Sequence, residues 1–290
     1  MSFVEYRARP ELTSPIAICA FAGWNDGGEG ATTAARELRD QWGARRFATI
    51  DPEEFYDFQV HRPTVRLLDG ETRRIDWPSN DFWWARVGDR DVAVFLGLEP
   101  NVRWRTYCEQ ILRVCSDVKA SVVVTLGAFL ADVPHTIAAP VSAASTDPAW
   151  ASRPGVLPAR YEGPTGIVGV LNDLAAKAGV PAVSLWAASP HYLPQTSNPK
   201  VALALMERLR DLLGLEIDTG EVELAARGWE REVNDAIDED GNLADYVKRL
   251  EEAAEQGLAI GADPSDVLSG EELAAELERY LREHGASDGE

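Results

Sequence analysis

Cysteine is scarce in this sequence, and its spacing excludes the architectures that depend on it. The three cysteines, Cys19, Cys108 and Cys115, are an odd number and form no Cys-x-x-Cys pair. This pattern offers neither a disulfide framework nor a zinc site, so we expect no bound metal. Cys108 and Cys115 lie seven residues apart in a helical pattern and therefore share one face. We expect small, buried thiols in a reducing compartment.

Basic residues are also few in comparison with acidic residues. The chain has 28 Lys and Arg against 48 Asp and Glu, a formal net charge of −20. Nucleic acids and anionic membranes both attract clustered Lys and Arg, so neither is an expected partner. The N-terminal residues MSFVEYRARPEL contain no apolar signal segment, and no apolar run approaches the ~18 residues of a membrane span. We therefore expect a soluble, cytoplasmic protein.

Signatures of known reactions are also missing. The sequence has no Walker A phosphate loop, no Gly-x-Ser-x-Gly elbow and no His-Glu-x-x-His motif. Gly28-x-Gly30-x-x-Thr33 is the nearest match to a dinucleotide fingerprint, but it lacks the last glycine, so we expect no cofactor. Glycines before a helix can still hold a phosphate through free N–H groups, which Asp26 would oppose unless it caps the helix. Because these catalytic motifs are missing, we favour a protein that is not an enzyme.

Acidic residues are concentrated near the C-terminal end. After Leu213 the chain has 23 acidic and 6 basic residues, whereas the first 213 residues have 25 and 22. Three segments there show helical apolar spacing, namely Leu224–Ile237, Leu243–Ala254 and Leu273–Leu281. They contain too few large apolar side chains to make much core of their own. We predict a core domain at residues 1–218 and an acidic helical segment at 219–290, packed on the core or on a neighbouring subunit.

The core shows the alternation of strands and helices that is typical of an α/β protein. The predicted buried strands are Ile16–Ala22, Val92–Leu98, Val122–Leu126 and Ala182–Ala187. A helical pattern comes after each strand, and the clearest is Trp104–Val118. The segment Thr64–Asp76 differs, because Asp69-Gly70 suits a type I′ turn and predicts a β-hairpin insertion. Trp77, Trp83 and Trp84 are expected to flank this antiparallel insertion at one side of the sheet, as core lining or as a protein-contact surface.

Two of the predicted strands end in a Pro-His loop. The segment Ser121–Thr136 ends with Pro134-His135-Thr136, and Ala182–Tyr192 ends with Pro190-His191-Tyr192. Since neighbouring parallel strands form a ligand crevice at their carboxyl ends, we expect both loops to border one crevice. The candidate binding residues in the strand-end loops are Trp24, Asp26, Gly28, Glu99, Trp104, Arg105, His135, Thr136, His191 and Tyr192.

The two histidines allow two interpretations. Histidine can act as an acid or base near neutral pH, in which case Asp26 or Glu99 would be a partner and Arg105 an anion contact. Alternatively, each histidine caps a helix or satisfies buried carbonyl groups, which is the interpretation we favour. Both interpretations predict that His135 and His191 are at least partly buried.

Five ordered segments carry a family resemblance over about residues 15–215. They are GWNDGGEGA at 23–31, LGLEPNVRWRTYCEQIL at 96–112, LGAFLADVPHT at 126–136, YEGPTGIVGVL at 161–171 and SLWAASPHYLPQTSNPKVALALMERL at 184–209. In this order and spacing they resemble the proteasome assembly chaperone family of the second-subunit type. The acidic C-terminal helices look like those of its bacterial branch.

The resemblance implies a three-layer α/β/α core similar to nucleoside phosphorylases and peptidyl hydrolases, commonly in homo-oligomers. For eukaryotic and archaeal relatives it implies proteasome assembly or binding, and for bacterial relatives it implies no established activity. Relatives that dock on a proteasome ring can use a C-terminal tail of a hydrophobic residue, Tyr and any residue. The segment Ala286–Glu290 does not match that tail, and the nearest candidate, Tyr280, lies within a predicted helix.

Three hypotheses follow for the function. The leading one is a non-enzymatic assembly-chaperone-like or scaffold protein that acts as a homo-oligomer, with a possible proteasome-related protein partner. The alternative is a binder or enzyme for a nucleoside-, phosphate- or amide-type small molecule in the strand-end crevice. The third is a crevice that is kept only for packing while partners bind elsewhere.

Overall fold

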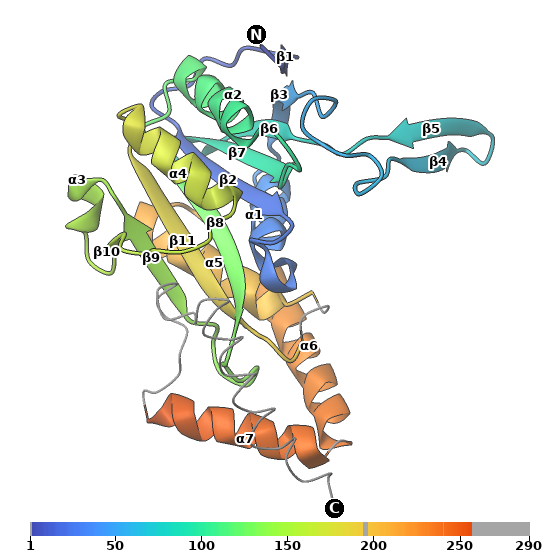
Figure 1. The fold of residues 1–290 in the computed structure, drawn as a ribbon, viewed down its shortest axis with the longest axis vertical. Helices are drawn as coiled ribbons and strands as arrows, with labels where there is room; N and C mark the ends of the chain where they lie inside the picture. The colour runs from blue at the N-terminus through green and yellow to red at the C-terminus, as the bar shows by residue number, and fades with distance from the viewer. Residues whose placement is uncertain (1, 194–196, 240, 257–290) are drawn as a thin grey trace, which may run out of the picture.

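The buried apolar segments form the centre of a nine-stranded sheet (Figure 1). The structure is a computed structural model, and it describes residues 2–193, 197–239 and 241–256. Across the sheet the strands are β1 (Val4–Tyr6), β3 (Arg45–Ile50), β6 (Asp81–Val87), β7 (Arg90–Leu98), β2 (Ile16–Ala22), β8 (Val122–Ala131), β11 (Ala182–Pro190), β9 (Val141–Ser145) and β10 (Leu157–Pro158). The four central strands β7, β2, β8 and β11 are parallel, as the sequence predicts.

Helices cover both faces of this sheet because its central strands are apolar on both sides. In β2, Ile16 and Ile18 face one layer and Cys19 and Phe21 face the other. The first layer contains α1 (Gly30–Gln41) and α5 (Pro199–Leu213), and the second contains α2 (Trp104–Asp117) and α4 (Ile167–Lys177). The short helices are η1 (Gly27–Glu29) and α3 (Pro148–Ala151). The predicted three-layer α/β/α core is therefore confirmed.

The hairpin insertion is also confirmed, and two tryptophans that follow it line the core. Strands β4 (Thr64–Leu68) and β5 (Thr72–Asp76) form a separate two-stranded sheet, joined by Asp69 and Gly70 with φ of 53° and 78°. Two successive positive φ angles are what a type I′ turn requires. Trp83 and Trp84 belong to β6, which pairs antiparallel with β3 and β7 at one side of the main sheet, and both pack against the core. The reason is that Phe82 packs on Phe95 of β7, with ring centroids 4.5 Å apart.

Two of the predicted acidic helices are present at the end of the described chain. Helix α6 (Gly220–Asp238) packs on α5, and α7 (Gly241–Glu255) follows it across the ends of the strands (Figure 1). Gly214 ends α5 in the left-handed conformation, so the chain turns back and α6 runs along the first helical layer. The third predicted helix, Leu273–Leu281, and Tyr280 within it lie outside the described residues.

No helix in the described part of the chain is long and apolar enough to cross a membrane. The three cysteines are buried and unbonded to one another, as expected for small core side chains. Burial raises the pKa of the Cys108 and Cys115 thiols to about 12, so both stay protonated at neutral pH.

The close approach of α1 and α5 depends on Gly30. A β-carbon at position 30 would lie 2.1 Å from Cγ1 of Val201 in α5. We expect Gly30→Ala to lower the free energy of unfolding by about 1–3 kcal/mol, the usual cost of overpacking, in urea denaturation followed by circular dichroism.

Gly228→Ala in α6 is the matched control, because a β-carbon there meets no described atom within 4 Å. We expect it to be neutral or to gain up to about 1 kcal/mol from helix propensity. Equal stability of Gly30→Ala and the wild type would show that α1 and α5 do not pack as closely as described.

Candidate functional site

The two Pro-His loops meet at the carboxyl ends of β8 and β11, and His135 lies at their centre. Its backbone N–H donates to the Tyr192 hydroxyl over 2.8 Å, and that hydroxyl donates to His135 Nδ1 over 2.7 Å. His135 Nε2 lies 2.8 Å from Asn234 Oδ1 of α6. Because an amide oxygen can only accept, the ring proton is on Nε2. Both ring nitrogens are therefore used within the protein, and the residue is only 2% exposed.

A lysine joins this loop to α5 and α6. Lys200 Nζ donates to the His135 carbonyl over 2.5 Å and to Glu230 Oε2 over 2.6 Å. The positive charge on Lys200 also disfavours a second positive charge on the imidazole. Burial is the main cause that lowers the pKa of His135, and the hydrogen bond to Asn234 opposes it. The site therefore holds a neutral imidazole.

The second loop is covered by α7. His191 Nδ1 lies 3.0 Å from Asp132 Oδ1, and His191 Nε2 lies 3.5 Å from the Tyr246 hydroxyl. Thr136 Oγ1 donates to Glu251 Oε1 over 2.6 Å. The rings of His191, Tyr192 and Tyr246 pack edge to face, with centroids 5.7–6.1 Å apart. Helices α6 and α7 thus lie on both loops where the sequence predicts a ligand crevice.

A small hydrophobic cluster completes this cover. It consists of buried residues of α6 and α7 with half-buried neighbours, namely Trp229, Val233, Ile237 and Val247 against Tyr192, Leu193, Leu243 and Ala244. Helical spacing in the sequence places Trp229, Val233 and Ile237 on one face. Spacing does not say which surface that face meets, so the sequence gives no signal that Asn234 binds His135.

The glycine-rich loop after β2 uses Asp26 to begin α1. Asp26 Oδ1 accepts from the Ala31 and Thr32 backbone N–H groups, over 2.7 and 3.3 Å, and Oδ2 accepts from the Thr32 hydroxyl. Burial raises the pKa of Asp26, and these hydrogen bonds oppose the shift. Gly28 has a φ of 63°, and its carbonyl accepts from Asn198 N–H over 2.7 Å. Asp26 thus takes two N–H groups that a phosphate would need.

Glu99, in the loop after β7, connects the glycine-rich loop after β2 with the start of α4. Its Oε1 accepts from Asn25 Nδ2 over 2.8 Å and from the Ile167 backbone N–H of α4 over 2.9 Å. Oδ1 of Asn25 is buried without a hydrogen-bond partner in the described part of the chain. It lies against Gly166, where a β-carbon would come within 2.2 Å of it.

The remaining candidates lie apart from the Pro-His loops. Trp24 is 69% exposed. Trp104 begins α2 and packs half-buried on the second helical layer, and Arg105 is exposed on the same helix. The structure therefore brings together His135, Thr136, His191 and Tyr192 as a Pro-His group, and the remaining candidates do not contact this group directly. A ligand-binding role for any of these residues stays a prediction.

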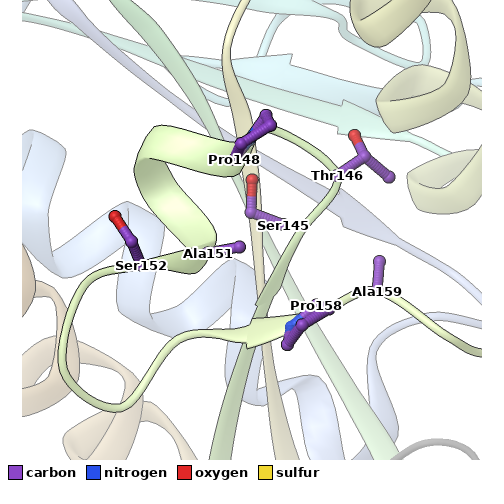
Figure 2. A pocket seen from close by; sticks show the side chains of 7 residues that line it. All are labelled: Ser145, Thr146, Pro148, Ala151, Ser152, Pro158 and Ala159. Atoms are coloured by element: carbon purple, nitrogen blue, oxygen red, sulfur yellow. The ribbon is translucent and has the colours of Figure 1, made fainter.

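Of two surface hollows, one lies away from the strand-end loops, and the other lies on α6 beside the residues that bind His135 and Lys200. The first, of about 540 Å³, lies between β9, α3 and β10 and is lined by Ser145, Thr146, Pro148, Ala151, Ser152, Pro158 and Ala159 (Figure 2). The Ser145 hydroxyl donates to the Ala182 carbonyl, so it is already engaged. The second, of about 620 Å³, lies on α6 at Leu224, Arg227, Glu230, Arg231 and Asn234. No group of three or more metal-ligating side chains exists among the described residues.

The neutral, buried state of His135 predicts a pH-dependent stability. Unfolded histidine takes a proton near pH 6.5, whereas the folded His135 resists it. Stability should therefore be fully present above about pH 6.5 and fall as the pH drops towards the lowered folded pKa, by up to about 1.4 kcal/mol per pH unit. Urea denaturation at pH 7.5, 6.5 and 5.5 measures this slope.

Two variants of this pair make the test specific. His135→Gln cannot titrate and should lose this part of the slope. Asn234→Asp places a carboxylate beside Nε2, which favours the charged ring. The fall in stability with decreasing pH should therefore be weaker in this variant, or reversed. Equal slopes in all three proteins would contradict the described geometry.

Comparison with known proteins supports the arrangement of the core. The chain matches the model of the PAC2 family over residues 20–237. A PAC2 family protein from Streptomyces avermitilis is 45% identical, with a TM-score of 0.75, over 80% of this chain and 99% of that chain. A Mycobacterium tuberculosis proteasome-assembly chaperone homologue is 44% identical, with a TM-score of 0.73, over the same 80% and 99%.

A more distant structure shares the fold. The archaeal proteasome activator PbaB of Pyrococcus furiosus is 19% identical, with a TM-score of 0.65, over 80% of this chain and 97% of that chain. None of the curated proteins matches the sequence. The family match and the two relatives confirm the resemblance carried by the five motifs, and this chain belongs to the PAC2 family.

Proposed function

We propose that this protein is a non-enzymatic, assembly-chaperone-like scaffold that acts as a homo-oligomer with a proteasome-related protein partner. Family membership supports a chaperone-like role, since one relative at 44% identity is a proteasome-assembly chaperone homologue. In such a scaffold the function depends on surfaces that contact other proteins, and not on a ligand bound in the strand-end crevice.

The observation that carries this proposal is the enclosure of His135. Catalysis by an imidazole needs a ring nitrogen within hydrogen-bond reach of a substrate. Here Nδ1 is bonded to Tyr192, Nε2 is bonded to Asn234, and the side chain is covered by α6. A substrate could reach the ring only if α6 moved away, which would expose Trp229 and Val233 to water.

Assembly of proteasome core particles from separately purified α and β subunits tests the proposal. We expect the chain to raise the yield or rate of assembly several-fold, measured by native gels and peptide hydrolysis, and native mass spectrometry to show an oligomer. His135→Gln should keep the effect at pH 8, because the ring carries no chemistry. A strict monomer that leaves assembly unchanged would rule the proposal out.

Small-molecule binding at the strand ends is the second candidate, and it is favoured by Oδ1 of Asn25, which has no hydrogen-bond partner among the described residues. Asn25 is only 1% exposed, so a ligand would reach this oxygen once the segment at Gly166 moves aside. Asn25 Oδ1 and the Glu99 carboxylate both accept hydrogen bonds, so the fitting ligand is a donor such as an amide or a nucleobase amino group. A phosphate fits less well, because Asp26 already occupies the N-terminus of α1.

Thermal shift measurements with a set of nucleosides and primary amides test this candidate. We expect a bound compound to raise the melting temperature of the wild type by ~2 °C or more, through preferential binding to the folded state. The shift should disappear in Asn25→Ala and persist in His135→Gln. The absence of any shift across the set would remove this candidate.

A further inference from the structure

The segment 159–166 joins β10 to α4 and is called the strap here. Because β10 lies at the edge of the sheet and α4 packs on β8 and β11, the strap crosses from the edge towards the centre (Figure 1). At its start the Ala159 N–H donates to the Ser145 carbonyl over 3.1 Å. Just after its end, the Ile167 N–H donates to Glu99 Oε1 over 2.9 Å. The strap is therefore held at both ends.

Between these ends the strap makes few contacts. Residues 160–165 are exposed, and within the described part of the chain no hydrogen bond or ion pair joins them to another segment. The Tyr161 hydroxyl donates instead to the Pro164 carbonyl over 2.7 Å, inside the strap. Segments with an exposed backbone and few buried contacts open most easily. We therefore expect the strap to move while the core stays folded.

The end of the strap covers a polar atom that lacks a donor. The Asn25 side chain is buried, its Nδ2 donates to Glu99 Oε1 over 2.8 Å, and its Oδ1 has no hydrogen-bond partner among the described residues. The bond to Glu99 fixes which amide atom is the oxygen, because a carboxylate can only accept. Gly166 lies over this oxygen, since a β-carbon there would come within 2.2 Å of it. A buried acceptor without a donor is costly, so this place favours a group that donates to it.

Glu99 brings a carboxylate to the same place. Its side chain is half-buried, and no Lys or Arg in the described part of the chain forms an ion pair with it. The N-terminus of α4 offsets this charge only in part, because a helix end carries about half a unit of positive charge. Hydrogen bonds from a charged donor are roughly twice as strong as those from a neutral one. A cationic donor therefore fits these two acceptors better than a neutral one.

We propose that the strap opens to admit a small molecule with a planar cationic group, an amidinium or a guanidinium, which donates to Asn25 Oδ1 and to the Glu99 carboxylate. Such a group carries several N–H donors in one plane, so it can serve both residues at once, whereas an ammonium group acts as a point charge. This inference rests on the second candidate function, small-molecule binding at the strand ends. It names the ligand class and the segment that closes the site.

Benzamidine and benzamide test the ligand class, because they share one shape and differ in charge. Benzamide presents a carbonyl oxygen where benzamidine presents a second N–H group, so it would set an acceptor against an acceptor. In isothermal titration calorimetry on the full-length protein, we expect the dissociation constant of benzamidine to be at least ~10-fold lower than that of benzamide. Added salt should reduce this difference, since it screens the charge on Glu99.

Two variants locate the bound cation. Glu99→Gln keeps an oxygen for the Ile167 N–H but removes the charge, and Asn25→Ala removes the unpaired oxygen. Each should weaken benzamidine binding at least ~10-fold, the loss expected for a hydrogen bond to a charged group. The matched control is Glu109→Gln, which removes an exposed carboxylate from α2 and should keep wild-type binding. Circular dichroism checks that every variant folds.

Gly166→Ala tests the strap. The φ of −94° at this position suits any residue, so the new methyl group meets only Asn25, and only when the strap is closed. The variant should favour the open strap and lower the dissociation constant of benzamidine by ~3-fold or more, because a closed state reduces the apparent affinity. Weaker binding in Gly166→Ala than in the wild type would show that the strap does not open.

The remaining outcomes separate this inference from the function on which it rests. Equal binding of benzamidine and benzamide, or unchanged benzamidine binding in Glu99→Gln, would overturn the cationic ligand. If a nucleoside or a primary amide still bound in an Asn25-dependent way, the second candidate function would stand without it. Binding of none of these compounds would remove both.

Discussion

The burial of the central strands on both faces is the constraint on which the rest of the structure depends. Alternate residues of β2 face the α1–α5 layer and the α2–α4 layer, and β8 beside it is equally apolar. A sheet of this kind is stable only when helices cover both sides. That requirement places the helices, and the parallel direction of β7, β2, β8 and β11 brings the loops that follow these four strands to one edge of the sheet.

The same layering explains what happens at that edge. Helix α6 returns along α5 and, at 19 residues, continues past the end of the layer towards the Pro-His loops. The second half of α6 brings Trp229 and Asn234 over His135. Helix α7 brings Tyr246 to His191 and Glu251 to Thr136. Polar groups that could have bound a ligand instead form hydrogen bonds with one another, as buried polar groups generally do.

Local patterns predicted most of the core and little of the site. The apolar runs of β2 and β7, the period of Trp104–Val118 and the Asp69-Gly70 turn each depend on residues near in sequence. Core lining, one of the two roles predicted for the tryptophans beside the insertion, is what Trp83 and Trp84 have, but no local pattern predicts that they lie in an antiparallel strand of the main sheet. The proximity of the two Pro-His loops was foreseen, whereas their cover by α6 and α7 was not.

The sequence by itself determined the parallel α/β core, the hairpin, the acidic end and the family. Hydrophobic periodicity, turn-forming residues and the order of motifs depend only on the order of residues along the chain. Tertiary structure alone decided the role of His135. Its partner Asn234 lies 99 residues away, and one helical turn of difference in α6 would place another side chain there. A contact between segments so distant depends on the packing of the whole layer, which no local pattern encodes.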